Sequence, residues 1–431
     1  SACLVGSEMC IRDSRTTAAT VTYTDNRVSG DVLTVSGTAT YADKNAAVGK
    51  TISATGITLS GTDAGNYTQN TTATTTATIS PRALTINGTY TPVNKLYDAT
   101  TTAGVSLPGS PTLSTIQGSD VVSLTGTPSF NFSQAGIGTG ISIITTGYSL
   151  TGTDAANYTL TLPTLSANIT IRTLTVSGTL SVTATKVYDG TTSATISNAA
   201  LLTLSNVPAG DANNAARLAI ASPVAQYSTK GVATGKSVTL TSAQLSGTSA
   251  GNYTLSLSGA PTTTANVTPR ALLVTATGIN KTYDGTTTAT VNLSSDKIAA
   301  DTIGINYTTA TFSTKTVETG KTVSVSGISL AGVDAANYTP NTTTTTTANI
   351  TLRTLTVTIS AANKVYDAGT SVSVTYGSNK LAADTLTITG TASFASKAAG
   401  TSRPVNATSI SVTGADAANY SANTTASTTA N

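Results

Sequence analysis

The chain of 431 residues contains no His and no Trp, one Met and two Cys. Only two Glu residues occur, Glu8 and Glu318, and charged residues make up 10% of the chain. Enzyme chemistry at neutral pH depends mostly on His, on a Cys thiolate or on paired carboxylates. The absence of His excludes Ser-His-Asp triads, histidine metal sites and mixed Cys/His zinc clusters. Because each Asp that recurs is also a turn residue, we predict no enzyme activity, no cofactor and no metal site.

Basic runs and long apolar runs are also missing. The net charge is +3, and the 22 Lys and Arg residues are scattered with few aromatic residues between them, so no nucleic-acid binding is predicted. No stretch of about 18 apolar residues occurs, so no membrane span is expected. The segment from Gly231 to Ser237 is similar to a phosphate-binding loop, but three residues separate its glycines where four are required. Nucleotide binding is therefore not predicted.

Thr is abundant, with 96 residues, and hydrophobic residues make up 39% of the chain. Leu355, Val357 and Ile359 alternate with Thr, which is the period of two expected of a half-buried strand. Thr tracts at 71–78 and 342–347 are predicted strands as well. Only residues 213–220 offer a candidate helix. The sequence therefore predicts an all-β fold, with thin cores because large aromatic residues are rare.

Three motifs recur with a period of 82 to 95 residues, which is long enough for each repeat to form a small domain. The first motif, Asp-Ala-(Gly/Ala)-Asn-Tyr, has its Asn at Asn66, Asn157, Asn252, Asn337 and Asn419. The second, Lys-x-Tyr-Asp, has its Tyr at Tyr97, Tyr188, Tyr283 and Tyr366. The third marks each junction with Arg82, Arg172, Arg270 or Arg353, followed by Ala or Thr and then Leu.

These motifs divide the chain into five modules, at residues 15–81, 82–171, 172–269, 270–352 and 353–431. The first module and the end of the fifth look truncated against the others. We expect tandem small β-sandwich modules of immunoglobulin-like type, with β-grasp-like modules as the alternative. The junctions carry no Gly/Ser-rich or Pro-rich linker and run strand into strand. We therefore expect the modules to stack as an elongated, semi-rigid rod.

Residues 1–14 are expected to be foreign to the protein. Residues 4–13 read Leu-Val-Gly-Ser-Glu-Met-Cys-Ile-Arg-Asp, which resembles a translated frame of a transposase sequencing adapter. Both cysteines, Cys3 and Cys10, lie in this segment or beside it. Alignment with the fourth module places the first module's missing Tyr-Asp pair at positions 13 and 14. A native N-terminal extension is the alternative.

The Asp-Ala-x-Asn-Tyr motif is predicted to be a structural corner. It resembles the corner of immunoglobulin domains, where a Tyr hydroxyl bonds back to the backbone of the turn. Ser249 replaces Asp in the third copy, a change that a hydrogen-bonded turn tolerates better than a metal site does. A sugar-stacking Tyr is the alternative. The predicted corner residues are Asp63, Tyr67, Asp154, Tyr158, Tyr253, Asp334, Tyr338, Asp416 and Tyr420.

The Lys-x-Tyr-Asp motif is predicted to be a strand end followed by a turn, in which Lys lies over Tyr. Asp-Gly supplies the positive φ of a tight turn, and two copies have Ala99 or Ala368 in place of this Gly. The alternative is a glycan or calcium contact, although calcium prefers a cluster of oxygens that is not found here. The candidate glycan contacts are Lys95, Tyr97, Asp98, Lys186, Tyr188, Asp189, Lys281, Tyr283, Asp284, Lys364, Tyr366 and Asp367.

The pairing of Lys-x-Tyr-Asp-Gly-Thr-Thr with a downstream Leu-x-Gly-x-Asp-Ala-x-Asn-Tyr resembles the YDG and MBG-type repeats of large bacterial exoproteins. Those proteins include adhesins like filamentous haemagglutinin, exported by two-partner secretion. The resemblance covers residues 15–431 and departs from the pattern at Ala99, Ala368 and Ser249. It implies a β-rich, non-catalytic repeat region that is secreted or held at the surface, with the outer membrane of a Gram-negative bacterium as the expected location.

Two functions are carried forward from the sequence. The first is the stalk of an adhesin, in which the modules hold a binding tip away from the cell. The second is an array of weak glycan-binding modules that gains by multivalency and takes extracellular polysaccharide or host glycans as partners. Tyr rings exposed in register would favour the array, and Tyr rings buried at corners would favour the stalk. The sequence indicates no oligomeric state.

Overall fold

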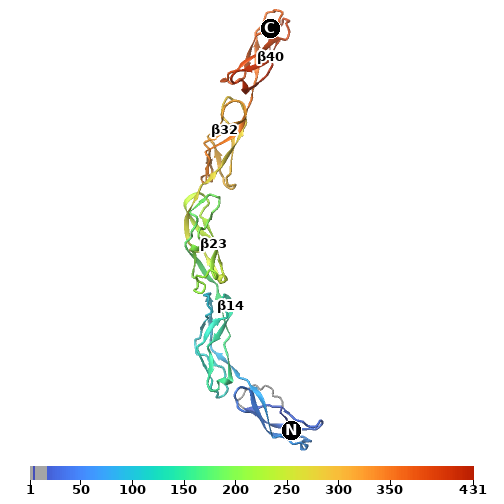
Figure 1. The fold of residues 1–431 in the computed structure, drawn as a ribbon, viewed down its shortest axis with the longest axis vertical. Coiled ribbons are helices and arrows are strands. Elements are labelled where there is room, and N and C mark those ends of the chain that lie inside the picture. Colours follow the sequence, from blue (N-terminus) through green and yellow to red (C-terminus); the bar gives the residue numbers. More distant parts are fainter. Residues whose placement is uncertain (1–2, 5–16) are drawn as a thin grey trace. The chain divides into compact units, whose positions relative to one another are not determined.

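The protein was analysed as a computed structural model that describes residues 3–4 and 17–431. The described residues form strands and short 3-10 helices of three residues each, and no α-helix occurs among them. Figure 1 labels one long strand in four of the five modules, for example β14 (Gly138–Thr146) and β40 (Arg403–Thr413). No helix in this part of the chain has the length and apolar character needed to cross a bilayer. The predicted all-β fold is confirmed.

The chain divides into two compact units, which are described separately. The first contains Ser1–Ser177, Thr203–Ser222 and Ala243–Gly259, and the second contains Gly178–Leu202, Pro223–Ser242 and Ala260–Asn431. The first and second modules therefore belong to the first unit, and the fourth and fifth to the second.

In the first unit, the first module contains a four-stranded sheet of β2 (Ala18–Ala19), β4 (Thr34–Tyr41), β5 (Ala47–Ser60) and β6 (Thr72–Ile79). Its core consists of Ala39, Tyr41, Ile52, Ala54, Ile57, Ala77 and Ile79. The short strand β1 (Cys3–Leu4) pairs with β3 (Tyr23–Thr24). In the second module, β14 lies between β13 (Ser129–Phe132) and β17 (Leu165–Thr170), which in turn pairs with β9 (Lys95–Leu96).

In the second unit, the fourth module repeats that arrangement. β32 (Glu318–Ser326) lies between β31 (Thr309–Phe312) and β35 (Thr343–Thr351), and β35 pairs with β28 (Lys281–Thr282). In the fifth module, β40 lies between β39 (Thr387–Phe394) and β42 (Ala426–Ala430). The predicted alternation is confirmed, because Leu355, Val357 and Ile359 are all buried. The tract at 342–347 falls largely in β35, and the tract at 71–78 falls largely in β6, as predicted.

The second, third, fourth and fifth modules each contain a parallel strand pair that places the junction Arg opposite the corner Tyr. The first strand of the module pairs with the strand that follows the Asp-Ala-x-Asn turn, and the partners in register are Arg82 with Tyr158, Arg172 with Tyr253, Arg270 with Tyr338 and Arg353 with Tyr420. One or two residues separate the last strand of one module from the first strand of the next, for example Leu352 between β35 and β36 (Arg353–Leu355). The junctions therefore contain no linker, as predicted.

One local prediction is wrong, and another lies outside the described residues. Residues 213–220 form turns and the start of β22 (Ala219–Tyr227) instead of a helix. Asn213 has φ +56°, and the N–H groups of Arg217 and Leu218 both donate to the Asn214 carbonyl, which gives turns that do not continue as a helix. The adapter-like segment falls almost wholly on residues that the structure does not describe, so its origin is not tested.

Candidate functional site

The residues singled out by the sequence meet at contacts between successive modules within each unit. In each of the junctions described below, one module supplies a loop that follows a Phe or Tyr, and in three of them it also supplies a Tyr from Lys-x-Tyr-Asp. The next module supplies an Asp that no sequence motif identified, together with the corner Asp, Asn and Tyr. We call this set of contacts the junction network.

The loop that reaches toward the next module is braced by a buried Lys. Lys321 is 3% exposed and donates to the carbonyls of Thr314 and Thr316 and to both hydroxyls, the Thr316 carbonyl at 2.6 Å. A β-bulge beside Gly320, at φ +63°, turns the Lys321 side chain under the loop. Lys50 and Lys236 donate in the same way to the carbonyls of Asn45 and Gly231. The phosphate-loop-like segment is therefore such a bulge, within β23 (Ala233–Ser246).

Three of the four Lys-x-Tyr-Asp tyrosines are buried. Tyr97, Tyr188 and Tyr283 are each at most 2% exposed, so their rings offer no free face for a sugar. Each hydroxyl donates to a carboxylate of the following module: Tyr97 to Asp211 at 3.0 Å, Tyr188 to Asp301 at 2.8 Å and Tyr283 to Asp384 at 3.0 Å. These tyrosines therefore belong to the contact between modules.

The same carboxylate also accepts the hydroxyl of its own module's corner Tyr. Tyr338 donates to Asp301 at 2.7 Å, and the N–H of Ile298 donates to the Tyr338 oxygen at 3.0 Å. The rings of Tyr188 and Tyr338 meet edge to face, with centroids 5.6 Å apart, a favourable aromatic geometry. Tyr97 with Tyr253 and Tyr283 with Tyr420 repeat this pairing. Asp211, Asp301 and Asp384 are thus each held by two tyrosines from two modules.

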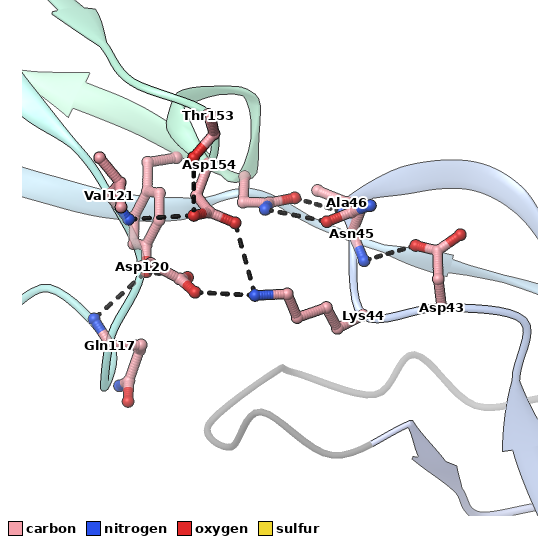
Figure 2. A network of polar contacts seen from close by, with 11 residues as sticks. Asp43, Lys44, Asn45, Ala46, Gln117, Asp120, Val121, Thr153 and Asp154 are labelled. Atoms are coloured by element: carbon pink, nitrogen blue, oxygen red, sulfur yellow. Dashed lines mark hydrogen bonds and ion pairs between the residues drawn. The ribbon is translucent and has the colours of Figure 1, made fainter.

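A Lys on the braced loop supplies the charge that balances the buried carboxylate. Figure 2 shows Lys44 between Asp120 and Asp154, with N–O distances of 3.0 Å and 3.4 Å. Asp120 is 8% exposed, and the second oxygen of Asp154 accepts the N–H of Val121. Lys230 contacts Asp301 and Asp334 in the same way, and Lys315 contacts Asp384 and Asp416. The corner Asp residues therefore fix their own turn and also face the preceding module.

The corner Asn closes the junction through the backbone. Its side-chain oxygen accepts an N–H from the facing loop of the preceding module: Asn157 from Ala46, Asn252 from Ile137, Asn337 from Val232 and Asn419 from Val317, at 2.7 to 3.1 Å. In the first junction the Asn157 amide also donates to the side-chain oxygen of Asn45 at 3.2 Å, and Figure 2 shows these contacts at Asn45 and Ala46. Asn157, Asn337 and Asn419 are buried, which fits a residue used in packing. No sequence argument gave this Asn a role.

The junction between the second and third modules differs at two facing positions. Ala135 occupies the place of the loop Lys, three residues after Phe132, and Ser249 occupies the place of the corner Asp. Here the Ser249 hydroxyl donates to Asp211 at 3.1 Å, and Arg217 of the same module pairs with Asp211 at 2.8 Å. The Lys and the second Asp are therefore absent together, which keeps the buried carboxylate balanced. This accounts for the exception at Ser249.

The residue after Tyr-Asp also contacts the next module. Gly190 and Gly285 have φ near +78°, and a Cβ there would come within 3.3 Å of Ile298 or 3.0 Å of Leu381. Ala99 adopts the same backbone at φ +63°, and its Cβ would lie 2.9 Å from a Cβ built on Gly210. Modules four and five have Ala300 and Ala383 at the position of Gly210. A larger residue on one side of this contact is thus matched by a smaller one on the other.

The pKa values of the ionisable groups at the junction are shifted in the directions that this geometry requires. Burial alone would raise the pKa of Asp301, but hydrogen bonds from Lys230, Tyr338 and Tyr188 hold that pKa below its usual value. The pKa of Asp384 is lowered in the same way, against burial, by Tyr420, Tyr283 and Lys315. Burial, and then the hydrogen bond to Asp301, raises the pKa of Tyr188. The ionised Asp and the neutral Tyr are therefore the stable pair.

The Lys of Lys-x-Tyr-Asp does not lie over its own Tyr, which corrects the prediction. Lys186 contacts Asp189 at 2.8 Å, donates to the Ser193 carbonyl at 2.8 Å, and lies over the ring of Tyr227, 5.7 Å from the centroid. The cation over Tyr188 is Lys230 instead, at 6.0 Å. The reason is the turn, whose carbonyls and Asp draw the Lys186 ammonium to their own side. Lys95, Lys281 and Lys364 bind the same turn, with Asp98, Asp284 and Asp367.

The structure places the remaining candidate residues as follows. Asp98, Asp189, Asp284 and Asp367 each accept the backbone N–H two residues later, so they form the predicted turn. Tyr366 differs from its equivalents because it is 63% exposed. In the first module Tyr67 donates to Asp31, and Asp63 accepts the N–H of Val32, so this corner has the same internal bonds as the others. The position of the first module's Tyr-Asp pair lies outside the described residues.

The described fold and site define an all-β protein of tandem repeats whose repeating motifs form the contacts between repeats. The YDG domain model matches five times, at residues 13–77, 80–167, 170–265, 268–347 and 351–430. The chain therefore belongs to the YDG domain family. No curated protein matches it.

Proposed function

We propose that this region is a non-catalytic stalk or spacer of a secreted or cell-surface bacterial adhesin. The observation that carries the proposal is the use of the recurring polar residues. Tyr188, Asp301 and Lys230 are bound to one another across a module boundary, and two other junctions repeat the buried Tyr–Asp contact. Residues that recur for ligand binding would be expected to face solvent, whereas residues that recur to join modules would be buried as these are.

A spacer needs joints that resist bending, and the junction network supplies three kinds of restraint. The one- or two-residue junction limits the length of free chain. The Asn-to-backbone contact fixes the braced loop, and the shared Asp binds the two tyrosines and the Lys in a site from which water is largely excluded, where such bonds are stronger. The YDG family match and the resemblance to exoprotein repeats support the bacterial surface location as part of the proposal.

The experiment that tests this proposal combines shape and ligand binding on the 431-residue chain. Small-angle X-ray scattering is expected to give a maximum dimension on the order of 150–200 Å, as five stacked modules of this size require. Glycan-array binding is expected to be absent. A compact particle would contradict the spacer role. Glycan binding that is lost in Tyr366→Ala, with the melting temperature unchanged, would instead support a glycan-binding array.

A further inference from the structure

An open hollow lies at the boundary between the second and third modules, within the first unit. Its apolar walls are Leu96 and Ile171 of the second module and Val207 and Pro208 of the third. The Leu96 side chain is 58% exposed and that of Ile171 is 42% exposed, so both present aliphatic surface to the hollow and to solvent. The hollow has a volume of about 480 Å³, which is in the range of sites that bind small molecules.

Arg172 brings a positive charge to this hollow. It lines the hollow together with Asn206, and its Nε and Nη1 atoms are buried without a hydrogen-bond partner in the described part of the chain. Buried donors without a partner are rare in folded proteins, and each one calls for an explanation. None of the described residues that line the hollow is acidic, and a guanidinium does not lose its charge in a protein. The charge of Arg172 is therefore not balanced by any lining group.

The equivalent arginines of the second and fourth modules have partners. The amide of Gln117, in the orientation that its surroundings favour, accepts from Arg82 at 3.2 Å. In the fourth module, a carboxylate oxygen of Asp296 lies 3.8 Å from Nη2 of Arg270. Asn206 occupies the position of Asp296, since each lies five residues before the junction Asp of its own module. The third module thus lacks the carboxylate that faces the Arg in the fourth.

The apolar wall is also a property of the third module. Val207 takes the place of Lys297 and Lys380, which donate to the backbone carbonyls of the junction Asp residues in the fourth and fifth modules. In the fifth module the Nε of Arg353 is likewise buried without a partner, but Lys380 places a charged side chain where Val207 stands in the third. The third module therefore combines an unpaired guanidinium with aliphatic walls.

We propose that this hollow binds a carboxylate carried by a short aliphatic group. A guanidinium and a carboxylate match in geometry and form two parallel hydrogen bonds. Because Nε and Nη1 of Arg172 have no partner to lose, the guanidinium can turn toward a ligand without breaking a hydrogen bond of these atoms. The aliphatic walls take the apolar part of the ligand, whereas an inorganic phosphate would leave them without a contact.

A ligand in this hollow would contact two modules at once. At this junction Ala135 and Ser249 stand in place of the loop Lys and the corner Asp, so no loop Lys faces a corner Asp across the boundary. The bound ligand would therefore add a contact between modules where the junction network has fewer charged groups. This inference goes beyond the spacer role, which requires no ligand.

The test is methyl-detected NMR of the full chain during titration with hexanoate. A saturable shift is expected in the methyl groups of Leu96, Ile171 and Val207, with a dissociation constant of about millimolar order for so small a ligand. Acetate lacks the aliphatic group and hexanol lacks the charge, so each is expected to bind at least about tenfold more weakly. N-acetylleucine, which models a peptide that ends in Leu, is compared with hexanoate, which models a fatty acid, and tighter binding of either supports the site and identifies the source of the carboxylate.

Two variants change the charge of the hollow in different ways. Arg172→Gln removes the guanidinium, and Asn206→Asp supplies the carboxylate that Asp296 provides in the fourth module. Each is expected to weaken hexanoate binding at least about tenfold. The matched control is Arg270→Gln, which removes the equivalent guanidinium of another module and is expected to leave hexanoate binding unchanged. Thermal melting of each variant checks that the fold persists.

Three results would overturn the proposal. The first is a wild type whose methyl groups show no saturable shift with hexanoate or with N-acetylleucine. The second is hexanoate binding that stays at full strength in both Arg172→Gln and Asn206→Asp, because the guanidinium would then take no part. The third is acetate binding as tight as that of hexanoate, since the aliphatic walls would then contribute nothing. None of these results bears on the spacer role, which the scattering experiment tests separately.

Discussion

The hydroxyl of Tyr188 donates a 2.8 Å hydrogen bond to the carboxylate of Asp301, a residue 113 positions later in the sequence and in the next module. Both groups are buried. The Tyr of Lys-x-Tyr-Asp thus serves a contact across a module boundary, because Phe would fill the same space but leave the carboxylate one donor short.

Tyr188→Phe is therefore expected to loosen the junction between the third and fourth modules by about 1–2 kcal/mol, since a buried charged acceptor loses a donor. The measurement is hydrogen exchange by mass spectrometry on peptides around Asp301, where exchange is expected to rise about five- to thirtyfold. The matched control is Tyr366→Phe, which removes the same hydroxyl from an exposed ring. If Tyr188→Phe and Tyr366→Phe raised hydrogen exchange equally, each in its own module, the hydrogen bond of Tyr188 would contribute nothing to stability.

A second prediction concerns the paired change at Ala135 and Ser249. Lys230→Gln removes a cation from the buried Asp301 and is expected to destabilise this junction, with solvent screening reducing the effect because the ammonium is partly exposed. Adding Asp334→Ser removes an unbalanced carboxylate and supplies a hydroxyl that can reach Asp301, as Ser249 reaches Asp211.

The double variant Lys230→Gln/Asp334→Ser is therefore expected to be more stable than the sum of the two single changes allows. A double-mutant cycle by hydrogen exchange at the same peptides measures this coupling. Additive effects would mean that the two positions vary independently, and the joint change at the second junction would then have no energetic basis.

A third prediction concerns pH. The pKa of Asp301 and that of Asp384 are lower in the folded chain than in an unfolded one, where the value is about 3.9. Their contribution to stability is therefore complete above about pH 4 and is lost as the pH falls through the folded values. The pKa of Tyr188 is raised, so its contribution is complete below about pH 10 and is lost as the pH rises further.

Calorimetry of the full chain between pH 7 and pH 3 checks the acid side. Melting temperatures are expected to fall below about pH 4, and Asp301→Asn with Asp384→Asn is expected to lower stability at pH 7 while flattening this fall. An unchanged acid slope in the double variant would place the titrating groups elsewhere. Absorbance at the tyrosinate band follows the alkaline side.

The fold was more accessible from the sequence than the site was. Alternation of Leu355, Val357 and Ile359 with Thr reports burial directly, because side chains of a strand alternate between faces. The turn after Tyr188 was also readable, since Asp-Gly has a known backbone preference. These are local properties, and short-range spacing carries them.

Partners across a module boundary are not local, and for this reason the sequence did not reveal them. Asp301 lies 37 residues before Tyr338 and 113 after Tyr188, and nothing in the spacing says that the three meet. A usable signal did exist: Lys-x-Ala-Ala-Asp occurs at both Asp301 and Asp384, at nearly the same distance before the corner Tyr. The prediction that Lys186 lies over Tyr188 is wrong for a similar reason. Two residues can share a strand face, but this does not say which acceptors will attract a flexible ammonium group.

The last prediction concerns the close contact between Ala99 and Gly210. A Cβ on Gly210 would lie 2.9 Å from that of Ala99, a distance that forces one backbone to move. Gly210→Ala is therefore expected to destabilise the junction between the second and third modules by about 1–3 kcal/mol. Adding Ala99→Gly removes the clash. The double variant then has Gly after Tyr-Asp and Ala before the junction Asp, the combination that Gly190 and Ala300 form at the next junction.

Ala99 has a left-handed backbone at φ +63°, a conformation that costs a residue with a Cβ roughly 1 kcal/mol or more, so Ala99→Gly also removes this strain. Gly loses more conformational entropy on folding, which offsets part of the gain. The double variant is thus expected to recover most of the stability lost in Gly210→Ala, measured by exchange in peptides around Asp211. A loss in the double variant as large as in Gly210→Ala alone would show that the two positions do not select each other.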